Sequence, residues 1–546
     1  MIMTKFPGVL TLRPNYRLSK PASRKKGLTV ALELEPVKGQ SRRTPALWLL
    51  LSLCLLLPAP ALYAGPAVQA WAQHYAGASG IKVAVDPQGN VVVAAQLSGW
   101  HGLIIKYSGA GVPLWTNIWG TFPTVVEDMA LDNSGNVYVT GYWDLGMGQY
   151  PEYETGAYSS QGIPLWTNFY NGPADLGDYA TGVAADSSGN VYVTGYAWRN
   201  EALRSCATLA YSSVGTPLWT NLYSGGSLSA ITDCLTAALA LDDAGNVYVI
   251  AYTDEATEGP AWGYALVAYS STGATRWVNS CNGCEIFPPV IVAASHSGNV
   301  YDIMGAYCGG GYLTSAYSSG GAFLWANQDV APCDSEAYAN AIAVGSNSNV
   351  YVTGCYGGGA TGYDYLTAAY SSLGTLLWTN RYNGPGNSND CAQALAVGSS
   401  GNVYVTGYSW GTNSSYDYLT IAYSSNGVPL WTNSFNEAGG SQAYALAVDA
   451  NDNVYVTGQS AGECVTIKYM PPPAIAFSAI AVLPGPTCLL TLAAPTNVAY
   501  RLDASTDLMN WQTLTNFPAL PVTTVQYTDA LAAGFACRFH RTVWSP

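Results

Sequence analysis

Short apolar runs separated by turn residues recur along the chain between residues 71 and 469. They are rich in Val, Thr and Tyr and bounded by Gly, Asn and Ser, which is typical of β-strands joined by tight turns. Each unit has four runs, A to D: A resembles Ala445–Asp449, B is Val-Tyr-Val-Thr, C resembles Tyr418–Tyr423 and D carries Leu-Trp-Thr-Asn. Runs B and C are apolar on both faces, which predicts sheets buried between neighbouring sheets. No helical period follows Gly65, so we expect an all-β chain.

The same unit occurs eight times. The Asn of the phrase Gly-Asn-Val-Tyr-Val-Thr-Gly recurs every 46 to 56 residues, at Asn90, Asn136, Asn190, Asn246, Asn299, Asn349, Asn402 and Asn453. A Trp in run D recurs with it, at Trp71, Trp115, Trp166, Trp219, Trp277, Trp325, Trp378 and Trp431. Four-stranded units of this period predict the blades of a β-propeller.

The two ends of the array are complementary. It begins on a D run at Trp71 and ends on a C run at Tyr469. We therefore predict an eight-bladed β-propeller closed by the N-terminal strand, since closure hides edge strands that would otherwise pair with other chains. A parallel β-solenoid is the alternative, although its coils are usually much shorter.

The first 64 residues have the order of an export signal. Ten of the 20 basic residues precede Ala64, and the apolar run Leu47–Leu57 is followed by Pro58 and small residues. This order predicts a signal peptide with an N-terminal extension over residues 1–64, and a protein exported to the periplasm, cell surface or medium. The apolar run is shorter than the roughly 20 residues that span a membrane. We expect no membrane span in the mature chain.

The remaining chain is strongly acidic. It holds 10 Lys and Arg against 32 Asp and Glu, a net charge of −22. Nucleic acids and anionic membranes are therefore poor partners, and neutral glycans, cations or basic proteins are better ones. We assign residues 65–470 to the propeller and residues 471–473 to a stiff proline linker. Residues 474–546 differ from the repeats in sequence and contain strand-like runs such as Cys488–Leu492. We predict that they form a small β-sandwich.

Cysteines suggest a disulfide framework. Once Cys54 leaves with the signal, eleven remain in an oxidising compartment. In an antiparallel blade the B–C loops and D–A loops lie on one face, here called the B–C/D–A face. Three pairs recur in the same register on that face: Cys206 with Cys234, Cys308 with Cys333, and Cys355 with Cys391. We also pair Cys281 with Cys284 and Cys488 with Cys537, which leaves Cys464 unpaired.

The rival interpretation of Cys281 and Cys284 is a redox site or half a metal site. A redox site expects a helix after the first Cys, and a zinc site needs two further ligands. Neither is evident in the sequence, so the structural disulfide is favoured.

The A–B turns, such as Asp186-Ser-Ser-Gly-Asn190, offer another candidate chemistry because they look like calcium loops. Each offers only two or three side-chain ligands, whereas calcium takes 6–8 oxygens. Asp capping the backbone of a turn explains the pattern better, so we predict no metal site and no cofactor, with calcium as the alternative. No Ser/His/Asp set or metal-binding His motif is visible, and no catalytic residue is assigned.

Five Trp residues outside the repeat positions fall in B–C loops, so all should lie on the B–C/D–A face: Trp100, Trp143, Trp198, Trp262 and Trp410. Carboxylates share these loops: Asp144, Glu152, Glu154, Glu201, Asp254, Glu255, Glu258, Asp364 and Asp417. Aromatic rings stack on sugar faces and carboxylates accept hydrogen bonds from hydroxyl groups, so this set predicts a ligand site. The alternative is that each Trp packs its own long loop onto the blade.

The segment Asp186-Ser-Ser-Gly-Asn-Val-Tyr-Val-Thr-Gly195 resembles the secreted bacterial β-propeller repeat (SBBP repeat) family, and the likeness covers residues 71–469. The Gly-x-x-x-Trp step, as at Gly215 to Trp219, looks like the tryptophan-docking step of quinoprotein propellers. This resemblance implies the propeller fold. It implies no particular reaction, because one fold hosts many functions.

Three functional hypotheses follow. The leading one is a non-enzymatic binding or surface-interaction protein that holds a glycan or protein ligand on the B–C/D–A face. The second is a polysaccharide-active enzyme on the same face, with Glu152 and Glu154 as acid and base. The third is a structural envelope protein.

Overall fold

In the computed structural model, description covers residues 67–544 with several gaps. The gaps are 121, 144–149, 202, 225–231, 256–261, 282–285, 307–310, 329–336, 358–360, 413, 472–475, 483–487, 494–498, 507–509, 519–521 and 531–538. The predicted signal therefore lies outside the described residues, as do Asp144, Glu258, Cys284, Cys308, Cys333 and Cys537. The backbone of Asp254, Glu255 and Trp262 is described, but their side chains are not.

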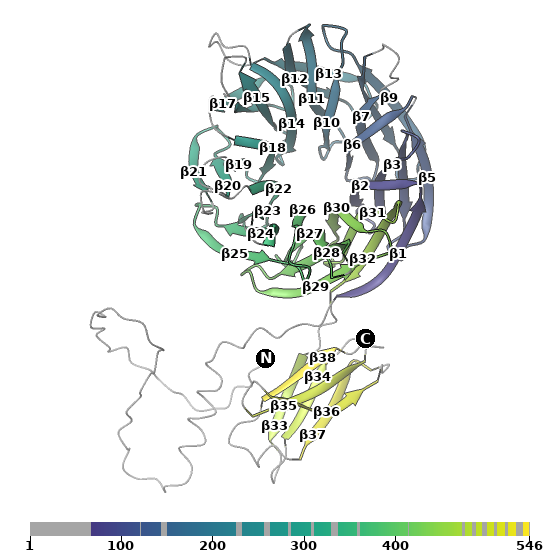
Figure 1. Cartoon of the computed structure of the whole chain (residues 1–546), viewed down its shortest axis with the longest axis vertical. Coiled ribbons are helices and arrows are strands. Elements are labelled where there is room, and N and C mark those ends of the chain that lie inside the picture. Colours follow the sequence, from purple (N-terminus) through teal and green to yellow (C-terminus); the bar gives the residue numbers. More distant parts are fainter. Residues whose placement is uncertain are drawn as a thin grey trace, which may run out of the picture. The chain divides into compact units, whose positions relative to one another are not determined.

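The chain divides into two compact units, of which the larger is Pro66–Pro471. Within the described part of this unit, every sheet is antiparallel and four-stranded, and there are eight of them. Figure 1 shows the sheets around a common centre, with β2, β6, β10, β14, β18, β22, β26 and β30 nearest that centre. The all-β prediction is confirmed, and the arrangement is propeller-like. No helix long and apolar enough to cross a bilayer occurs where the structure is described.

The strands of the eight sheets fall into four sets by their order in the repeat. The A strands are β2 (Ala78–Val85), β6 (Thr124–Leu131), β10 (Tyr179–Ala185), β14 (Thr232–Leu241), β18 (Ile286–Ala294), β22 (Ala337–Val344), β26 (Asp390–Val397) and β30 (Ser441–Val448). The B strands are β3 (Val91–Leu97), β7 (Val137–Trp143), β11 (Val191–Asn200), β15 (Val247–Glu255), β19 (Val300–Ala306), β23 (Val350–Gly357), β27 (Val403–Trp410) and β31 (Val454–Ser460).

The outer two sets complete each sheet. The C strands are β4 (Gly102–Tyr107), β8 (Glu152–Tyr158), β12 (Leu203–Tyr211), β16 (Trp262–Tyr269), β20 (Tyr312–Tyr317), β24 (Tyr363–Tyr370), β28 (Tyr416–Tyr423) and β32 (Glu463–Met470). The D strands are β5 (Pro113–Trp119), β9 (Pro164–Tyr170), β13 (Pro217–Tyr223), β17 (Thr275–Cys281), β21 (Phe323–Gln328), β25 (Leu376–Tyr382), β29 (Pro429–Phe435) and β1 (Val68–Ala76).

The burial of each strand follows its place in the sheet. B strands are buried along most of their length, as in β7, where Val137, Tyr138 and Val139 are fully enclosed. D strands alternate between exposed and half-buried positions, as in β9. A hydrogen bond of 2.9 to 3.2 Å joins Thr side chains of neighbouring B and C strands in five sheets, and it satisfies hydroxyl groups that would otherwise be buried unpaired.

Asp side chains stabilise A–B turns by accepting hydrogen bonds from residues of the same turn. Asp186 Oδ1 accepts hydrogen bonds from the backbone N–H groups of Ser188 and Asn190, and its Oδ2 accepts from the Asn190 amide and the Tyr192 hydroxyl. Gly189 takes the left-handed conformation, with φ +78°, that the turn requires. These contacts support a turn role for the Asp-x-x-Gly-Asn phrase.

Each repeat Trp docks onto the following sheet. Trp219 Nε1 donates to the Ser271 carbonyl at 2.9 Å, and the Asn221 side chain donates to the Gly273 carbonyl at 2.8 Å. Gly273 has φ +83°, and a Cβ there would lie 2.7 Å from the Trp219 ring. The same Trp to carbonyl bond occurs at 2.9 to 3.2 Å for seven Trp residues, namely Trp71, Trp115, Trp166, Trp219, Trp277, Trp325 and Trp378.

The first strand of the array pairs with the last. β1 runs antiparallel to β32, with Val68 opposite Met470 and Ala76 opposite Glu463. Trp71 Nε1 and Lys468 Nζ both donate to the Gly109 carbonyl, in the turn between β4 and β5. Contacts of β1 therefore reach both the final and the first sheet.

The second unit includes Pro472–Pro546. Its described strands form two three-stranded antiparallel sheets. One contains β33 (Ala476–Val482), β34 (Cys488–Ala493) and β37 (Thr524–Asp529), and the other contains β35 (Tyr500–Ser505), β36 (Trp511–Phe517) and β38 (Phe539–Trp544). One buried cluster contains Leu490 and Leu502, one from each sheet.

The predicted bond between Cys488 and Cys537 is not formed, because Cys488 is a free, buried thiol. Cys488 begins β34 and lies opposite Asp529 of β37. Cys537 lies outside the described residues, two positions before β38 in the other sheet. The two cysteines therefore lead into different sheets.

Asp302 breaks the apolar pattern of the B strands, because it occupies the position of the second Val in Val-Tyr-Val-Thr. It is fully buried, and its environment includes the hydrogen-bonded hydroxyl groups of Tyr264 and Tyr317. Burial raises the pKa of Asp302 to about 7. The folded chain therefore holds a proton that an unfolded Asp releases near pH 4.

We predict that Asp302 makes the protein less stable as the pH rises. Between about pH 4 and pH 7 the folded state binds more protons than the unfolded state, so the free energy of unfolding falls across that window. Asp302→Asn keeps the shape without the charge, so it should stabilise the protein by up to about 4 kcal/mol at pH 8 and change little at pH 4.5. Urea denaturation at both pH values measures this. Glu201→Gln, at an exposed carboxylate, is the control, and an equal effect of Asp302→Asn at both pH values would contradict the argument.

Candidate ligand-binding face

One pocket on the B–C/D–A face lies where the two ends of the repeat array meet. Its volume is about 310 Å³. Its walls come from the β1–β2 connection, the β3–β4 loop and the β31–β32 turn. We call it the seam pocket, and it is lined by Gly77, Ala78, Ser79, Gln96, Leu97, Ser98, Trp100, Gln459 and Gly462.

Trp100 is the exposed aromatic residue of this pocket, with 64% of its surface accessible. Its φ of 61° is left-handed, which is rare for a bulky side chain. Three backbone hydrogen bonds hold the loop: Trp100 donates to Leu97, Ser98 donates to Gly77, and Thr124 donates to Trp100. A strained conformation that the surroundings impose is typical of ligand sites. These bonds fix the backbone of Trp100, and its large ring is exposed to solvent at the pocket wall.

Gln96 ties this loop to the next sheet. Its Oε1 accepts from the Val126 N–H at 2.8 Å, and its Nε2 donates to the His101 and Thr124 carbonyls at 3.2 and 3.1 Å. Its amide is therefore occupied by hydrogen bonds to the backbone. The other polar side chains of the lining are Ser79, Ser98 and Gln459. Among the described residues that line the pocket, none has an ionisable side chain. Such a pocket suits a neutral ligand with hydroxyl groups and one apolar face.

Two predicted site residues are buried. Trp143 is 8% exposed, with its ring 5.3 Å from that of Phe122. Glu154 is 1% exposed and accepts a hydrogen bond from the Thr124 hydroxyl at 2.8 Å. These two side chains are therefore enclosed, because Phe122 in the preceding D–A loop packs on Trp143 and Thr124 at the start of β6 bonds Glu154. Glu152 is half-buried at the start of β8.

Trp198 and Trp410 are half-buried and held by a shared device. Asp178 accepts from the Trp198 N–H at 3.0 Å and from the Gly172 N–H, and Asp390 accepts in the same way from Trp410 at 2.9 Å and from Gly384. Both carboxylates are fully buried, and burial raises the pKa of Asp178 to about 6. Packing of the loop onto its sheet, the alternative set out from the sequence, therefore describes these two Trp residues.

Other predicted acids have separate surroundings. Asp417 is half-buried, which raises its pKa, and accepts a hydrogen bond from Asn436. Asp364 is buried and paired with Arg381. Glu201 is exposed at the turn before β12. None of these three acids lines the seam pocket.

A tyrosine cluster was missed by the sequence analysis. The Tyr179 ring lies 4.7 Å from that of Tyr142 and 4.9 Å from that of Tyr196, and the Arg204 guanidinium lies 5.2 Å from Tyr196 and 5.4 Å from Trp198. All are half-buried. The signal in the sequence was the Tyr that follows Val-Tyr-Val-Thr-Gly at Tyr142, Tyr196 and Tyr408.

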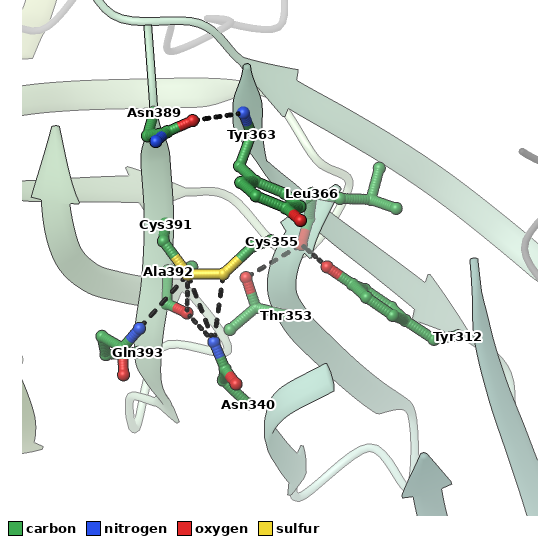
Figure 2. Close-up of a disulfide and its surroundings, with 10 residues drawn as sticks. All are labelled: Tyr312, Asn340, Thr353, Cys355, Tyr363, Leu366, Asn389, Cys391, Ala392 and Gln393. Atoms are coloured by element: carbon green, nitrogen blue, oxygen red, sulfur yellow. Dashed lines mark hydrogen bonds between the residues drawn. A yellow bond between two sulfur atoms is a disulfide. The ribbon is translucent and has the colours of Figure 1, made fainter. Parts of the chain in front are cut away.

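Two predicted disulfides, Cys206–Cys234 and Cys355–Cys391, are confirmed. Each joins a sheet to the A strand of the next one. Figure 2 shows Asn340 beside the Cys355–Cys391 bond, where its amide donates to the Ala392 carbonyl at 2.8 Å. Cys281 is also disulfide-bonded, and its predicted partner Cys284 lies outside the described residues.

Comparisons with known proteins support the repeat. Residues 174–200, which contain β10 and β11, match the model of the SBBP family, described as a beta-propeller repeat. No curated protein matches the chain. Among solved structures, the chain is similar to one titled as a crystal structure of the eukaryotic initiation factor, with 10% identity, a TM-score of 0.36, and coverage of 66% of this chain and 88% of the other.

We predict that Asp390 stabilises the protein through the Trp410 loop. Asp390→Asn replaces one accepting oxygen with an N–H donor that faces another N–H, so it should cost about 1–3 kcal/mol of unfolding free energy. Thermal and urea denaturation measure this loss. Glu201→Gln, which changes an exposed carboxylate in the same way, should have little effect. Equal stability of the two variants would show that the buried carboxylate does not hold the loop.

Proposed function

We propose that this chain, which belongs to the SBBP beta-propeller repeat family, is an exported eight-bladed propeller that binds a ligand at the seam pocket without catalysing a reaction. The neutral lining favours a glycan over a charged ligand, and a protein ligand is the alternative. The exposed, conformationally constrained Trp100 at the pocket wall is the observation that carries the proposal.

The contacts of β1 support eight blades and a closed ring. β1 provides the fourth strand of the last sheet, and its Trp71 binds the turn of the first sheet as other repeat Trp residues bind the turns that follow them. Asn433 exchanges hydrogen bonds with the backbone of Ala67 at 2.9 and 3.0 Å, so the residue before β1 also contacts the preceding blade.

Export is supported by two independent features. The order of basic, apolar and small residues before Gly65 is that of a secretory signal. The disulfides Cys206–Cys234 and Cys355–Cys391 are typical of oxidising compartments.

The enzymatic alternative requires an acid and a base that flank one open site, and Glu152 and Glu154 do not. Glu154 is enclosed and bonded to Thr124, whereas Glu152 is half-buried, so the two carboxylates do not flank one open site. No further observation favours a hydrolase, and binding remains the function that the geometry supports best.

We predict that removing the Trp100 ring weakens glycan binding while leaving the fold intact. Trp100→Gly is the informative change, because glycine takes the left-handed conformation without strain and should keep or raise stability. A glycan array on the purified protein identifies the ligand class, and titration calorimetry then compares affinities. We expect at least tenfold weaker binding, since one aromatic anchor contributes about 2 kcal/mol.

Leu373→Ala, at a C–D turn residue that is 84% exposed, is the matched control and should bind normally. Unchanged affinity in Trp100→Gly would remove the seam pocket as the site. Absence of binding to every glycan would favour a protein ligand or a structural role.

A further inference from the structure

The seam pocket is built from segments nearly 400 residues apart in the chain. Residues 77–100 supply one side, and Gln459 and Gly462 supply the other. Two contacts hold these sides together: Gly80 of β2 packs against Thr457 and Gly458 of β31, and β1 pairs with β32, whose last pair in this direction is Ala76 opposite Glu463. The pocket therefore lies directly at the end of the strand pair that joins the start of the array to its finish.

Undocking of β1 would dismantle this pocket. Gly77, which follows β1 with φ +70°, accepts the hydrogen bond from the Ser98 N–H in the Trp100 loop. If β1 left β32, Gly77 and the β1–β2 connection would lose the position set by Ala76 and Glu463, and the Ser98 N–H would lose the carbonyl that it binds. A ligand that contacts Gly77 and the Trp100 loop together can bind only the docked state.

From this geometry we infer that an uncharged sugar ligand of the seam pocket acts as a latch on the ring, so that ligand binding and β1 docking reinforce each other. The inference rests on the proposed function, because it takes the same pocket as the binding site. By linkage, a ligand that binds only the docked state slows undocking by the factor 1 + [L]/Kd. At one hundred times Kd this is about one-hundredfold.

The protein carries its own reporter of undocking. Cys464 of β32 is a free thiol that is 2% exposed and lies opposite Tyr75 of β1. Both residues belong to one buried cluster at the seam. Burial raises the pKa of the Cys464 thiol to about 11, so a thiol reagent should reach it chiefly when β1 has opened.

The experiment measures the labelling rate of Cys464 by iodoacetamide, read from its own peptide by mass spectrometry. The probes are hexasaccharides of β-1,4-linked glucose, of β-1,3-linked glucose and of N-acetylglucosamine. The labelling rate is measured without a probe and with each probe at a concentration that saturates the protein. We expect the tightest-binding probe to slow labelling about one-hundredfold at one hundred times its Kd. In Trp100→Gly, whose Kd is expected to be at least tenfold higher, the same probe concentration should slow labelling by no more than about elevenfold.

Hydrogen–deuterium exchange separates a local latch from general stabilisation. The bound probe should protect β1 and β32 and leave the distant pair β16 and β17 unchanged. Equal protection of both pairs would overturn the inference, as would Trp100-dependent binding with no change in Cys464 labelling. In these two cases the proposed function stands. If no probe binds, both the inference and the glycan-binding function fail.

A covalent lock gives a second, independent arm. Tyr75→Cys places a thiol opposite Cys464, and its oxidation would fix β1 to β32. In the oxidised variant the probe should no longer change exchange in β1, because the strand cannot leave. The reduced form of the same variant is the control and should respond to the probe. Full protection by the probe in the locked form would contradict a latch.

Discussion

The structure depends on the packing of a tryptophan ring against a turn glycine, which has no Cβ. In seven successive contacts, a ring from one sheet meets a left-handed Gly in the following sheet at a distance where a methyl group would collide, 2.5 to 2.8 Å. The indole N–H and an Asn side chain then bind backbone carbonyls of that turn, as at Trp219 and Asn221. Because this contact requires both the Trp ring and the Gly, a sheet that carries the Trp must be followed by a sheet that carries the Gly. This contact sets the spacing of the whole array.

That constraint divides the repeat into a fixed half and a variable half. The A–B and C–D turns carry the Asp caps and docking glycines, so their sequences recur from sheet to sheet. The opposite face has no equivalent requirement, and the strand ends and loops near it carry the disulfides, the tyrosine cluster and Trp100. Chemical variety therefore accumulates on one face, as expected where a rigid scaffold positions loops.

The sequence allowed the strands, the docking Trp residues and two disulfides to be predicted, because each depends on a local phrase repeated in register. It did not distinguish Trp100 from Trp143, since the exposure of each depends on loops of a neighbouring sheet, such as Phe122 beside Trp143. Asp302 escaped notice for a similar reason. Its burial at a Val position becomes evident only once the strand is placed between two sheets. Cys488 was wrongly paired because its sheet partner, β37, could not be known.

The direction of β1 has a mechanical consequence. Val68 lies opposite Met470, so the chain enters and leaves this strand pair at the same end. The hydrogen bonds of an antiparallel pair are perpendicular to the strands. A tension applied between the segments before Val68 and after Met470 would therefore load these bonds one after another, as in a zipper, instead of shearing all of them at once. Sequential rupture needs little force. Under traction from its two ends the array would begin to open at its own junction, while the sheets that follow still carry no load.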